Sequence, residues 1–171
     1  MSPSLPLVTI AIPTYNRAQT YLPLALASAL GQTYSNLEIV VSDNCSSDRT
    51  AAFVASKKDP RIRYYRHSVA IPPNDNFNFC LEQALGEFFL LLLDDEVLDP
   101  DFVSICMDAA AEEPQAGLIR TGLRMIDANG VVVQQVANKV QGLNLSDFFL
   151  GWFAGDTALY LCNTLFRTEC L

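Results

Sequence analysis

Two adjacent carboxylates, Asp94 and Asp95, follow directly on the apolar run 88–93, and a third, Glu96, comes next. A run that is continuously apolar, rather than alternating, is typical of a strand covered on both faces in a parallel sheet. Open α/β sheets bind their ligands at the carboxyl ends of such strands. Neighbouring acids repel each other there, and Mg²⁺ or Mn²⁺ bridging to a phosphate oxygen would relieve that repulsion. The alternative is a solvated turn in which Asp94 or Asp95 caps the next helix.

Two other polar loops follow apolar strand-like runs and supply further candidate residues. Tyr15 lies in the loop 13–17, and its ring could stack on a nucleotide base. Asp43 lies in the loop 42–48, and its carboxylate could accept a hydrogen bond from a base N–H, because an ionised carboxylate only accepts. Neither loop is rich in glycine, which argues against a dinucleotide-binding turn and against a P-loop. The structural alternatives are that Tyr15 covers the sheet edge and that Asp43 closes an Asx turn.

Composition restricts the classes of protein to which the chain can belong. Its 171 residues are half hydrophobic, which suits one well-buried domain. The formal net charge of -8 argues against a nucleic-acid partner, and an anionic ligand would need a metal ion or a few placed cations. The start of the chain does not resemble a signal peptide, and the run 88–93 is too short to span a bilayer. We therefore expect no transmembrane segment.

The cysteines and the single histidine do not indicate a catalytic or metal centre. Five cysteines are scattered without a C-x-x-C pair, so neither a disulfide framework nor a zinc site is predicted. Buried free thiols of a reducing cytoplasm are the expected state. His67 is expected to be a surface or packing residue.

Alternating strands and helices must position the three loops. The expected elements are strands over 8–12, 37–41, 62–65 and 88–93, with helices over 20–30, from a cap at Ser46 or Ser47 to Ser56, over 74–85, and from Asp99 onward. The later part is expected to form strands 118–126 and 131–136 joined by a turn at 127–130, a helix 145–152 and a strand 159–166. This order predicts an α/β fold with a doubly wound, mostly parallel, Rossmann-like sheet and antiparallel additions after residue 115.

The chain resembles the family 2 glycosyltransferases, whose nucleotide-binding half has the GT-A fold. The resemblance rests on the order and spacing of several motifs between residues 8 and 100, which is more specific than any one of them. The motifs are VTIAIPTYNR (8–17), ASALGQTY (27–34), EIVVSDNCSSDRT (38–50), NFN (76–78), ALGEF (84–88) and LDDEVLDP (93–100). From residue 118 onward the match is looser, although NTLFR (163–167) resembles a later strand that leads towards the acceptor region.

The resemblance implies roles for the residues that match the motifs. Pro13, Thr14 and Tyr15 would line the base and ribose, with Tyr15 beside the base. Asp43 would bind the edge of the base, usually uracil.

The acidic motif would take the place of the D-x-D acids of the family. Asp94 would then lie towards the ribose, and Asp95 would bind the Mg²⁺ or Mn²⁺ ion. The register stays open, because Leu93 occupies a place where many members carry an acid. The role of Glu96 also stays open.

Two departures from the family pattern affect the assignment of the diphosphate-binding residue and of the catalytic base. The loop 67–73 lacks the arginine that many members place near the diphosphate, and Arg17 or Arg66 could replace it. The catalytic base of the family is a carboxylate after the strand that ends near residue 166. Asp156 lies too early for this role, so we name no base and expect it beyond Leu171. A single domain over residues 1–171, cut off before the acceptor segment, is the expected organisation.

These inferences predict a sugar transferase of polysaccharide biosynthesis. It would move a sugar from a nucleotide-diphosphate sugar, with UDP preferred, to a hydroxyl of a glycan, a lipid-linked or another acceptor. The reaction would be metal-assisted and, as is usual in the family, inverting. A non-catalytic nucleotide-sugar-binding module or inactive fragment is the alternative, and a nucleotidyltransferase is disfavoured because its glycine-rich basic loop is missing. The expected location is the cytoplasm, with attachment to the inner face of a membrane as a variant.

Overall fold

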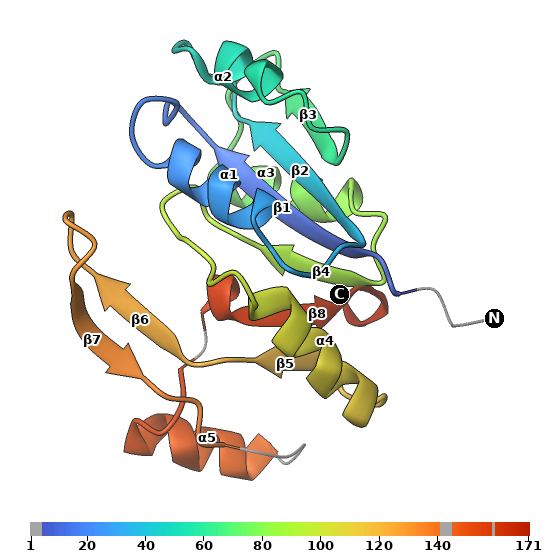
Figure 1. Cartoon of the computed structure of the whole chain (residues 1–171), viewed down its shortest axis with the longest axis vertical. Coiled ribbons are helices and arrows are strands. Elements are labelled where there is room, and N and C mark those ends of the chain that lie inside the picture. The colour runs from blue at the N-terminus through green and yellow to red at the C-terminus, as the bar shows by residue number, and fades with distance from the viewer. Residues whose placement is uncertain (1–4, 141–144, 159) are drawn as a thin grey trace.

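The computed structural model describes residues 5–140, 145–158 and 160–171, and its centre is a six-stranded sheet with helices on both faces (Figure 1). The strands are β1 (Val8–Thr14), β2 (Leu37–Asp43), β3 (Ile62–Arg66), β4 (Phe88–Leu91), β5 (Leu118–Arg120) and β8 (Thr164–Arg167). Their order is β3-β2-β1-β4-β8-β5. The first four are parallel, whereas β8 runs antiparallel to both β4 and β5. The predicted α/β fold with late antiparallel additions is confirmed.

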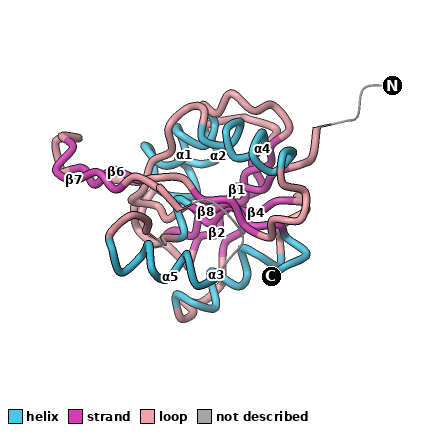
Figure 2. Tube along the Cα trace, turned by 90° about the horizontal axis from the view of Figure 1, so that it is seen from below, coloured by secondary structure: helices cyan, strands magenta, loops and turns pink. Residues whose placement is uncertain are grey.

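Helices connect the strands and form a layer on each face of the sheet. They are α1 (Leu22–Leu30), α2 (Thr50–Ser56), α3 (Pro73–Glu82), α4 (Phe102–Glu112) and α5 (Leu145–Ala154), with short 3₁₀ helices η1 (Leu161–Asn163) and η2 (Thr168–Cys170). Figure 2 shows α1, α2 and α4 on one face, and α3 and α5 on the other. Because β1 connects to β2 on one side and lies beside β4 on the other, the strand order reverses between β1 and β4, which is where open α/β sheets bind ligands.

The core explains why the central strands are continuously apolar. Every residue of β1, β2 and β4 is buried. Ile10 and Leu90 belong to the cluster that includes α1 and α4, whereas Ala11 and Leu91 pack with Cys80 of α3 on the other face. A strand between two helical layers has no solvent face, so both of its side-chain rows are mainly apolar, with buried polar exceptions such as Thr9 and Glu38.

A separate two-stranded sheet projects from the main body (Figures 1 and 2). It consists of β6 (Leu123–Ile126) and β7 (Val132–Val136), joined by the predicted turn 127–130. The single strand expected over 118–126 was wrong, because β5 joins the main sheet and β6 pairs only with β7. The break falls at Gly122, where an added Cβ would lie 2.7 Å from the carbonyl oxygen of Val136.

Three predicted boundaries also differ from the structure. Neither serine caps α2; instead Asp48 Oδ1 accepts the backbone N–H of Thr50 at 2.9 Å. Helix α4 begins at Phe102 rather than at Asp99, whose carbonyl oxygen accepts the Gln32 amide at 2.8 Å. The strand expected over 159–166 is shorter, since β8 begins at Thr164 after η1, and residue 159 lies outside the described residues.

The cysteines are free thiols, and the single histidine packs against an aromatic ring. All five cysteines are free, but only Cys80 and Cys106 are buried, so the expectation of five buried thiols was wrong, most clearly for the exposed Cys170. The ring of His67 packs edge-on against Phe79, with centroids 4.7 Å apart. Within the described ranges, no helix has the length and apolar character needed to cross a membrane.

Candidate functional site

The loops that follow β1, β2 and β4 meet at one edge of the sheet, as the doubly wound fold requires. Thr14, the last residue of β1, is in register with Asp43, the last residue of β2. The hydroxyl of Thr14 donates a hydrogen bond of 2.7 Å to Asp94 Oδ2, across 80 residues of sequence. The structure therefore brings the first strand, the second strand and the acidic motif together at the point where the strand order reverses.

Asp94 lies in a partly buried position that disfavours its charge. Burial raises the pKa of Asp94, and the neighbouring Asp95 adds to this. The Thr14 hydroxyl, the Tyr15 backbone amide and the charge of Arg17 act in the opposite direction without overcoming burial. A cation bound beside this carboxylate would favour its ionised form, because an opposite charge lowers a carboxyl pKa.

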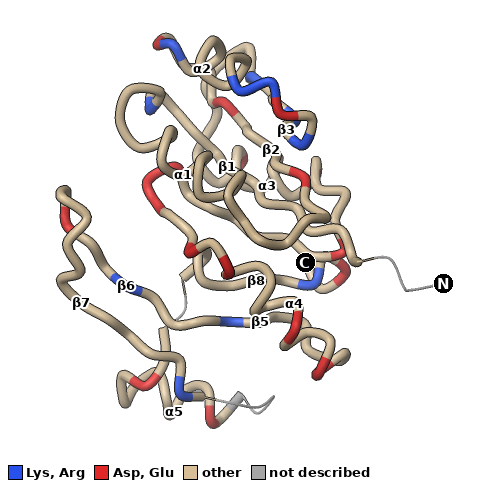
Figure 3. Tube along the Cα trace, viewed as in Figure 1, with Lys and Arg blue, Asp and Glu red and all other residues tan. Residues whose placement is uncertain are grey.

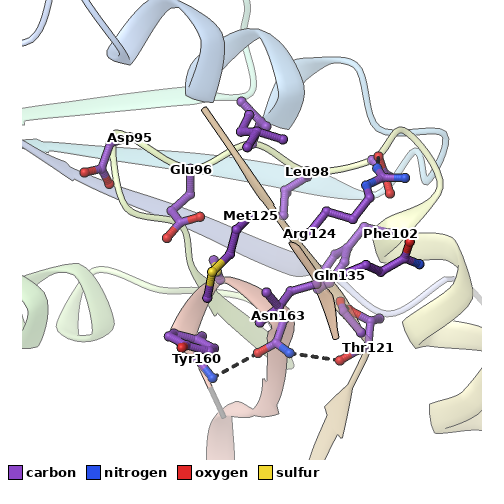
Figure 4. Close-up of a pocket in the computed structure, with 16 residues that line it drawn as sticks. Asp95, Glu96, Leu98, Phe102, Thr121, Arg124, Met125, Gln135, Tyr160 and Asn163 are labelled. Atoms are coloured by element: carbon purple, nitrogen blue, oxygen red, sulfur yellow. Dashed lines mark hydrogen bonds and ion pairs between the residues drawn. The ribbon is translucent and has the colours of Figure 1, made fainter. Parts of the chain in front are cut away.

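Asp95 and Glu96 line a cavity of about 480 Å³ (Figure 4), and none of its lining residues comes from the loops of Tyr15 and Asp43. Its other walls come from the loop 97–99 and from the β6–β7 hairpin. The remaining lining residues are Phe102, Thr121–Ile126, Gln135, Tyr160, Cys162 and Asn163. In Figure 4 the Glu96 carboxylate points toward Met125, while Asp95 lies at one end of the cavity. The acidic motif thus contributes to the wall of a pocket of small-molecule size.

Hydrogen bonds hold the cavity wall that comes from the later part of the chain. The Asn163 side chain accepts the backbone N–H of Tyr160 at 3.1 Å and donates to the carbonyl of Thr121 at 2.8 Å (Figure 4). Arg124 of the hairpin forms an ion pair with Asp99 across the opening. The sequence analysis missed this wall because no local pattern shows that residues 121–163 return to the acidic motif.

Cys162 adds a thiol to this wall. Burial, together with the charges of Glu96 and Asp95, raises the pKa of Cys162 to about 12, so the thiol stays protonated near neutral pH. Over the described ranges, no group of three or more His, Cys, Asp or Glu side chains is arranged to hold a metal ion. A bound cation would therefore need ligand oxygens in addition to those of the protein.

Asp43 is fully buried, and both of its carboxylate oxygens are engaged inside the protein. Oδ1 accepts the backbone N–H of Ser46 at 2.8 Å, which closes the turn, and Oδ2 accepts the Tyr64 hydroxyl at 2.5 Å. Burial and this bond to Asp43 raise the pKa of Tyr64. Arg66 Nε lies 3.8 Å from the same oxygen. In this conformation Asp43 organises its loop, and contact with a base would require the residues that cover its carboxylate to move.

Tyr15 and Pro13 lie in contrasting surroundings. Tyr15 is 53% exposed, so its ring is available to a ligand, whereas Pro13 is buried within β1, opposite Ser42 of β2.

Asn16, which the sequence analysis did not single out, joins the first two loops. Its Oδ1 accepts the backbone N–H groups of Ser47 at 2.8 Å and Asp48 at 3.3 Å, and its own N–H donates to Ser46 Oγ at 2.9 Å. Its φ of 55° is left-handed, a conformation that asparagine adopts more readily than most residues. The asparagine next to Tyr15, opposite a serine-rich loop, was the available sequence signal.

Comparison with known proteins agrees with this geometry. The family model described as Glycosyl transferase family 2 matches residues 9–148. The chain is 33% identical over 159 residues to the GalNAc(5)-diNAcBac-PP-undecaprenol beta-1,3-glucosyltransferase of Campylobacter jejuni, covering 89% of this chain and 50% of that protein. It is 29% identical over 139 residues to the chondroitin synthase of Escherichia coli, covering 78% of this chain and 20% of that protein.

A solved structure shows the same fold. S. aureus TarS 1–349 in complex with UDP superposes with a TM-score of 0.71 at 25% identity, over 95% of this chain and 47% of that one. The chain thus spans about half the length, or less, of these relatives.

Proposed function

Because this chain belongs to glycosyl transferase family 2, we propose that it binds a nucleotide-diphosphate sugar and that the sugar is transferred to an acceptor hydroxyl. The observation that carries the proposal is the Thr14–Asp94 hydrogen bond, which joins the first strand to the acidic motif at the strand-order reversal. UDP is the proposed nucleotide, since the TarS relative is a complex with UDP.

The residues of the first two loops would hold the nucleoside. Tyr15 would stack on the base, because its ring is exposed at the carboxyl edge of the sheet. Pro13 and Thr14 would form the floor beneath base and ribose, and Asp94 would accept from a ribose hydroxyl. Asp43 would accept the base N–H once the residues that cover its carboxylate move.

Asp95 is the proposed ligand of a Mg²⁺ or Mn²⁺ ion. The residues fit such an ion, because hard cations prefer oxygen ligands and Mg²⁺ at phosphate sites commonly uses only one or two carboxylates beside phosphate oxygens. The exposed Asp95 carboxylate supplies one such ligand. When bound, the ion would stabilise the charge of the departing diphosphate.

The acceptor is proposed to enter the cavity beside Asp95 and Glu96, because no residue of the two nucleoside loops lines it. Transfer with inversion needs a carboxylate base for the acceptor hydroxyl, and we assign that role to no residue of this chain. A glycan or lipid-linked acceptor is proposed because the C. jejuni relative is named for an undecaprenol-diphosphate-linked glycan.

Asp95→Ala tests the metal assignment. The unsubstituted chain is expected to bind UDP more tightly with Mn²⁺ than with EDTA, and Asp95→Ala should remove that difference, because the ion loses its proposed protein ligand. Isothermal titration calorimetry measures both affinities, with Asp108→Ala, an exposed acid of α4, as the matched control. UDP binding that is the same with and without Mn²⁺ in all three proteins would contradict the proposal. Metal-dependent binding without sugar transfer to any acceptor would instead favour a non-catalytic binding module.

Asn16→Ala tests whether the bond network between the first two loops prepares the nucleotide site. We expect UDP affinity to fall about tenfold, since the bonds from the Ser47 and Asp48 N–H groups to the Asn16 side chain are lost and alanine disfavours the left-handed backbone. Asn16→Gly keeps the backbone conformation but loses the side-chain bonds, so its loss should be smaller. Asn78→Ala, on the exposed side of α3, is the control. Equal UDP affinity in Asn16→Ala and the control would show that the network is irrelevant to binding.

A further inference from the structure

We propose that Asn76 is a positioning residue for nucleoside recognition, which holds the main chain of Asp43 in place. The assignment rests on the proposed function for the contact between Asp43 and the base. Asn76 begins the NFN motif (76–78), which has no part in the nucleotide contacts proposed above. It is singled out by its burial, its hydrogen bonds and its place relative to Asp43.

The Asn76 side chain is a buried polar group whose bonds all lead to the end of the sheet that carries the site. Only 3% of the residue is exposed, although it lies near the start of α3. Its Oδ1 accepts the Ser42 hydroxyl at 2.6 Å and the His67 ring at 3.0 Å, and its Nδ2 donates to the Ser42 carbonyl at 3.3 Å. Because an amide oxygen only accepts, His67 Nε2 is the donor in this network. Asn76 therefore connects α3 with β2 and with the residue that follows β3.

These bonds hold the backbone on both sides of Asp43. Ser42 precedes Asp43 at the end of β2, so the bond to its carbonyl fixes the peptide unit that leads into Asp43. The backbone N–H of His67 donates to the Asp43 carbonyl at 2.9 Å, and Asn76 holds the His67 ring. Asn76 thus acts on the peptide unit before Asp43 directly and on the one after it through His67.

The backbone bonds are separate from the bonds of the Asp43 carboxylate. That carboxylate is engaged by Ser46 and Tyr64 and has to be uncovered before a base can bind. The bonds of Asn76 act on the main chain, so they keep the end of β2 in place while the covering side chains move. Placement matters because a hydrogen bond weakens steeply away from its favoured distance and angle. A displaced strand end would cost the base contact without removing the carboxylate.

Asn76 carries no charge, which allows geometry to be tested apart from electrostatics. Figure 3 shows red segments at the acidic motif and blue segments along α2 and β3. Replacing any of these charged residues would change the affinity for an anionic nucleotide through charge alone. Asn76→Ala leaves the charge balance as it is, so a change in base selectivity reports the position of Asp43.

The test compares UDP with CDP, which share ribose and diphosphate but differ in the base, since uracil carries a ring N–H that cytosine lacks. Both are titrated with Mn²⁺ against the unsubstituted chain, Asn76→Ala, His67→Ala and His67→Gln. The unsubstituted chain should prefer UDP, because the Asp43 carboxylate only accepts. Asn76→Ala should lower UDP affinity about tenfold and CDP affinity much less. His67→Ala should cause a smaller loss of the same kind, and His67→Gln should recover part of it, because the glutamine amide can donate to Asn76.

Gly86→Ala is the matched control for lost stability. Its Cβ would lie 2.6 Å from the Thr9 backbone nitrogen, at the opposite edge of the sheet, so the variant is strained away from the site. It should keep the preference for UDP over CDP. Circular dichroism and the thermal midpoint establish that each variant retains the fold, and the two His67 variants decide by the same criterion if Asn76→Ala does not fold.

The outcomes distinguish this inference from the function on which it rests. Equal losses of UDP and CDP affinity in Asn76→Ala would show only general support of the loop, and unchanged affinities would also overturn the assignment. UDP binding without preference over CDP in the unsubstituted chain would overturn the Asp43 contact, and this assignment with it. Absence of UDP binding in the unsubstituted chain would overturn the proposed function itself.

Discussion

Replacing Glu38 by alanine is expected to lower the free energy of unfolding by about 3 kcal/mol, a large part of the stability of a domain of this size. The Glu38 carboxylate is almost fully buried at the end of the sheet opposite the candidate site. It accepts hydrogen bonds from Thr9 Oγ1 at 2.6 Å, the Leu85 amide at 2.6 Å and Arg63 Nη1 at 2.8 Å. Its removal would leave these donors in a poorly hydrated space, which costs more than the bonds themselves contribute.

The same carboxylate makes stability depend on pH. Burial alone would raise the pKa of Glu38, but the bonds from Thr9, the Leu85 amide and Arg63 outweigh burial and hold that pKa below its ordinary value. Because the folded-state pKa is lower than the unfolded one, the stabilisation is complete above the ordinary glutamate pKa of about 4.3. It is lost as pH falls through the folded-state value.

Urea unfolding of the unsubstituted chain, Glu38→Ala and Glu38→Gln between pH 7 and pH 3 measures both effects. Glu38→Gln keeps the shape and one acceptor but not the charge, so its deficit should shrink as the pH falls below the ordinary glutamate pKa. Glu82→Gln, an exposed residue of α3, is the matched control and should change the free energy of unfolding by less than about 0.5 kcal/mol. A Glu38→Gln deficit that stays constant with pH would contradict the assigned role of the charge.

The sheet was predictable because the apolar composition of its central strands indicates that they are buried. The run 8–12 contains no charged residue and stops at a proline, and the structure buries all of β1. The doubly wound, mostly parallel sheet followed from the alternation of strands and helices. Because parallel strands end at the same edge of a sheet, this prediction put the loops of Tyr15, Asp43 and Asp94 at one edge although no contact between them was known.

Contacts between residues distant in the sequence were not predictable, and these decide the chemistry of the site. The Thr14–Asp94 bond spans 80 residues, and no residue near Thr14 in the sequence indicates that Asp94 is its partner. The bond from the Thr50 N–H to Asp48 was not predicted, because two serines nearby have the same capping propensity and no local pattern decides among them. The Asp43 carboxylate could be placed at the sheet edge, but its engagement by Tyr64 depends on the pairing of β2 with β3.

Gly86→Ala is expected to lower the free energy of unfolding by about 2–3 kcal/mol, because there is no space for a side chain. A Cβ at Gly86 would lie 2.6 Å from the Thr9 nitrogen and 2.7 Å from the Phe88 carbonyl oxygen, both backbone atoms that cannot turn aside. Gly31→Ala is the matched control, since its Cβ would meet its nearest neighbour, the carbonyl oxygen of Ala27, at 3.2 Å, and its φ is negative. Thermal and urea unfolding should show a large loss for Gly86→Ala alone, and comparable losses in both variants would contradict the steric argument.

Thr9 links the sites of the two stability predictions. Its hydroxyl accepts the Gly86 N–H at 2.9 Å and donates to Glu38. An alanine at position 86 would push the Thr9 backbone away and weaken its bond to Glu38. Glu38→Ala should therefore cost less in the Gly86→Ala background than in the unsubstituted chain, by at least about 0.5 kcal/mol. Strictly additive losses in the double variant would mean that the amino ends of β1, β2 and β4 are stabilised independently. A coupled result would show that this edge of the sheet forms one hydrogen-bonded unit, which leaves the opposite edge free to carry the ligand-binding loops.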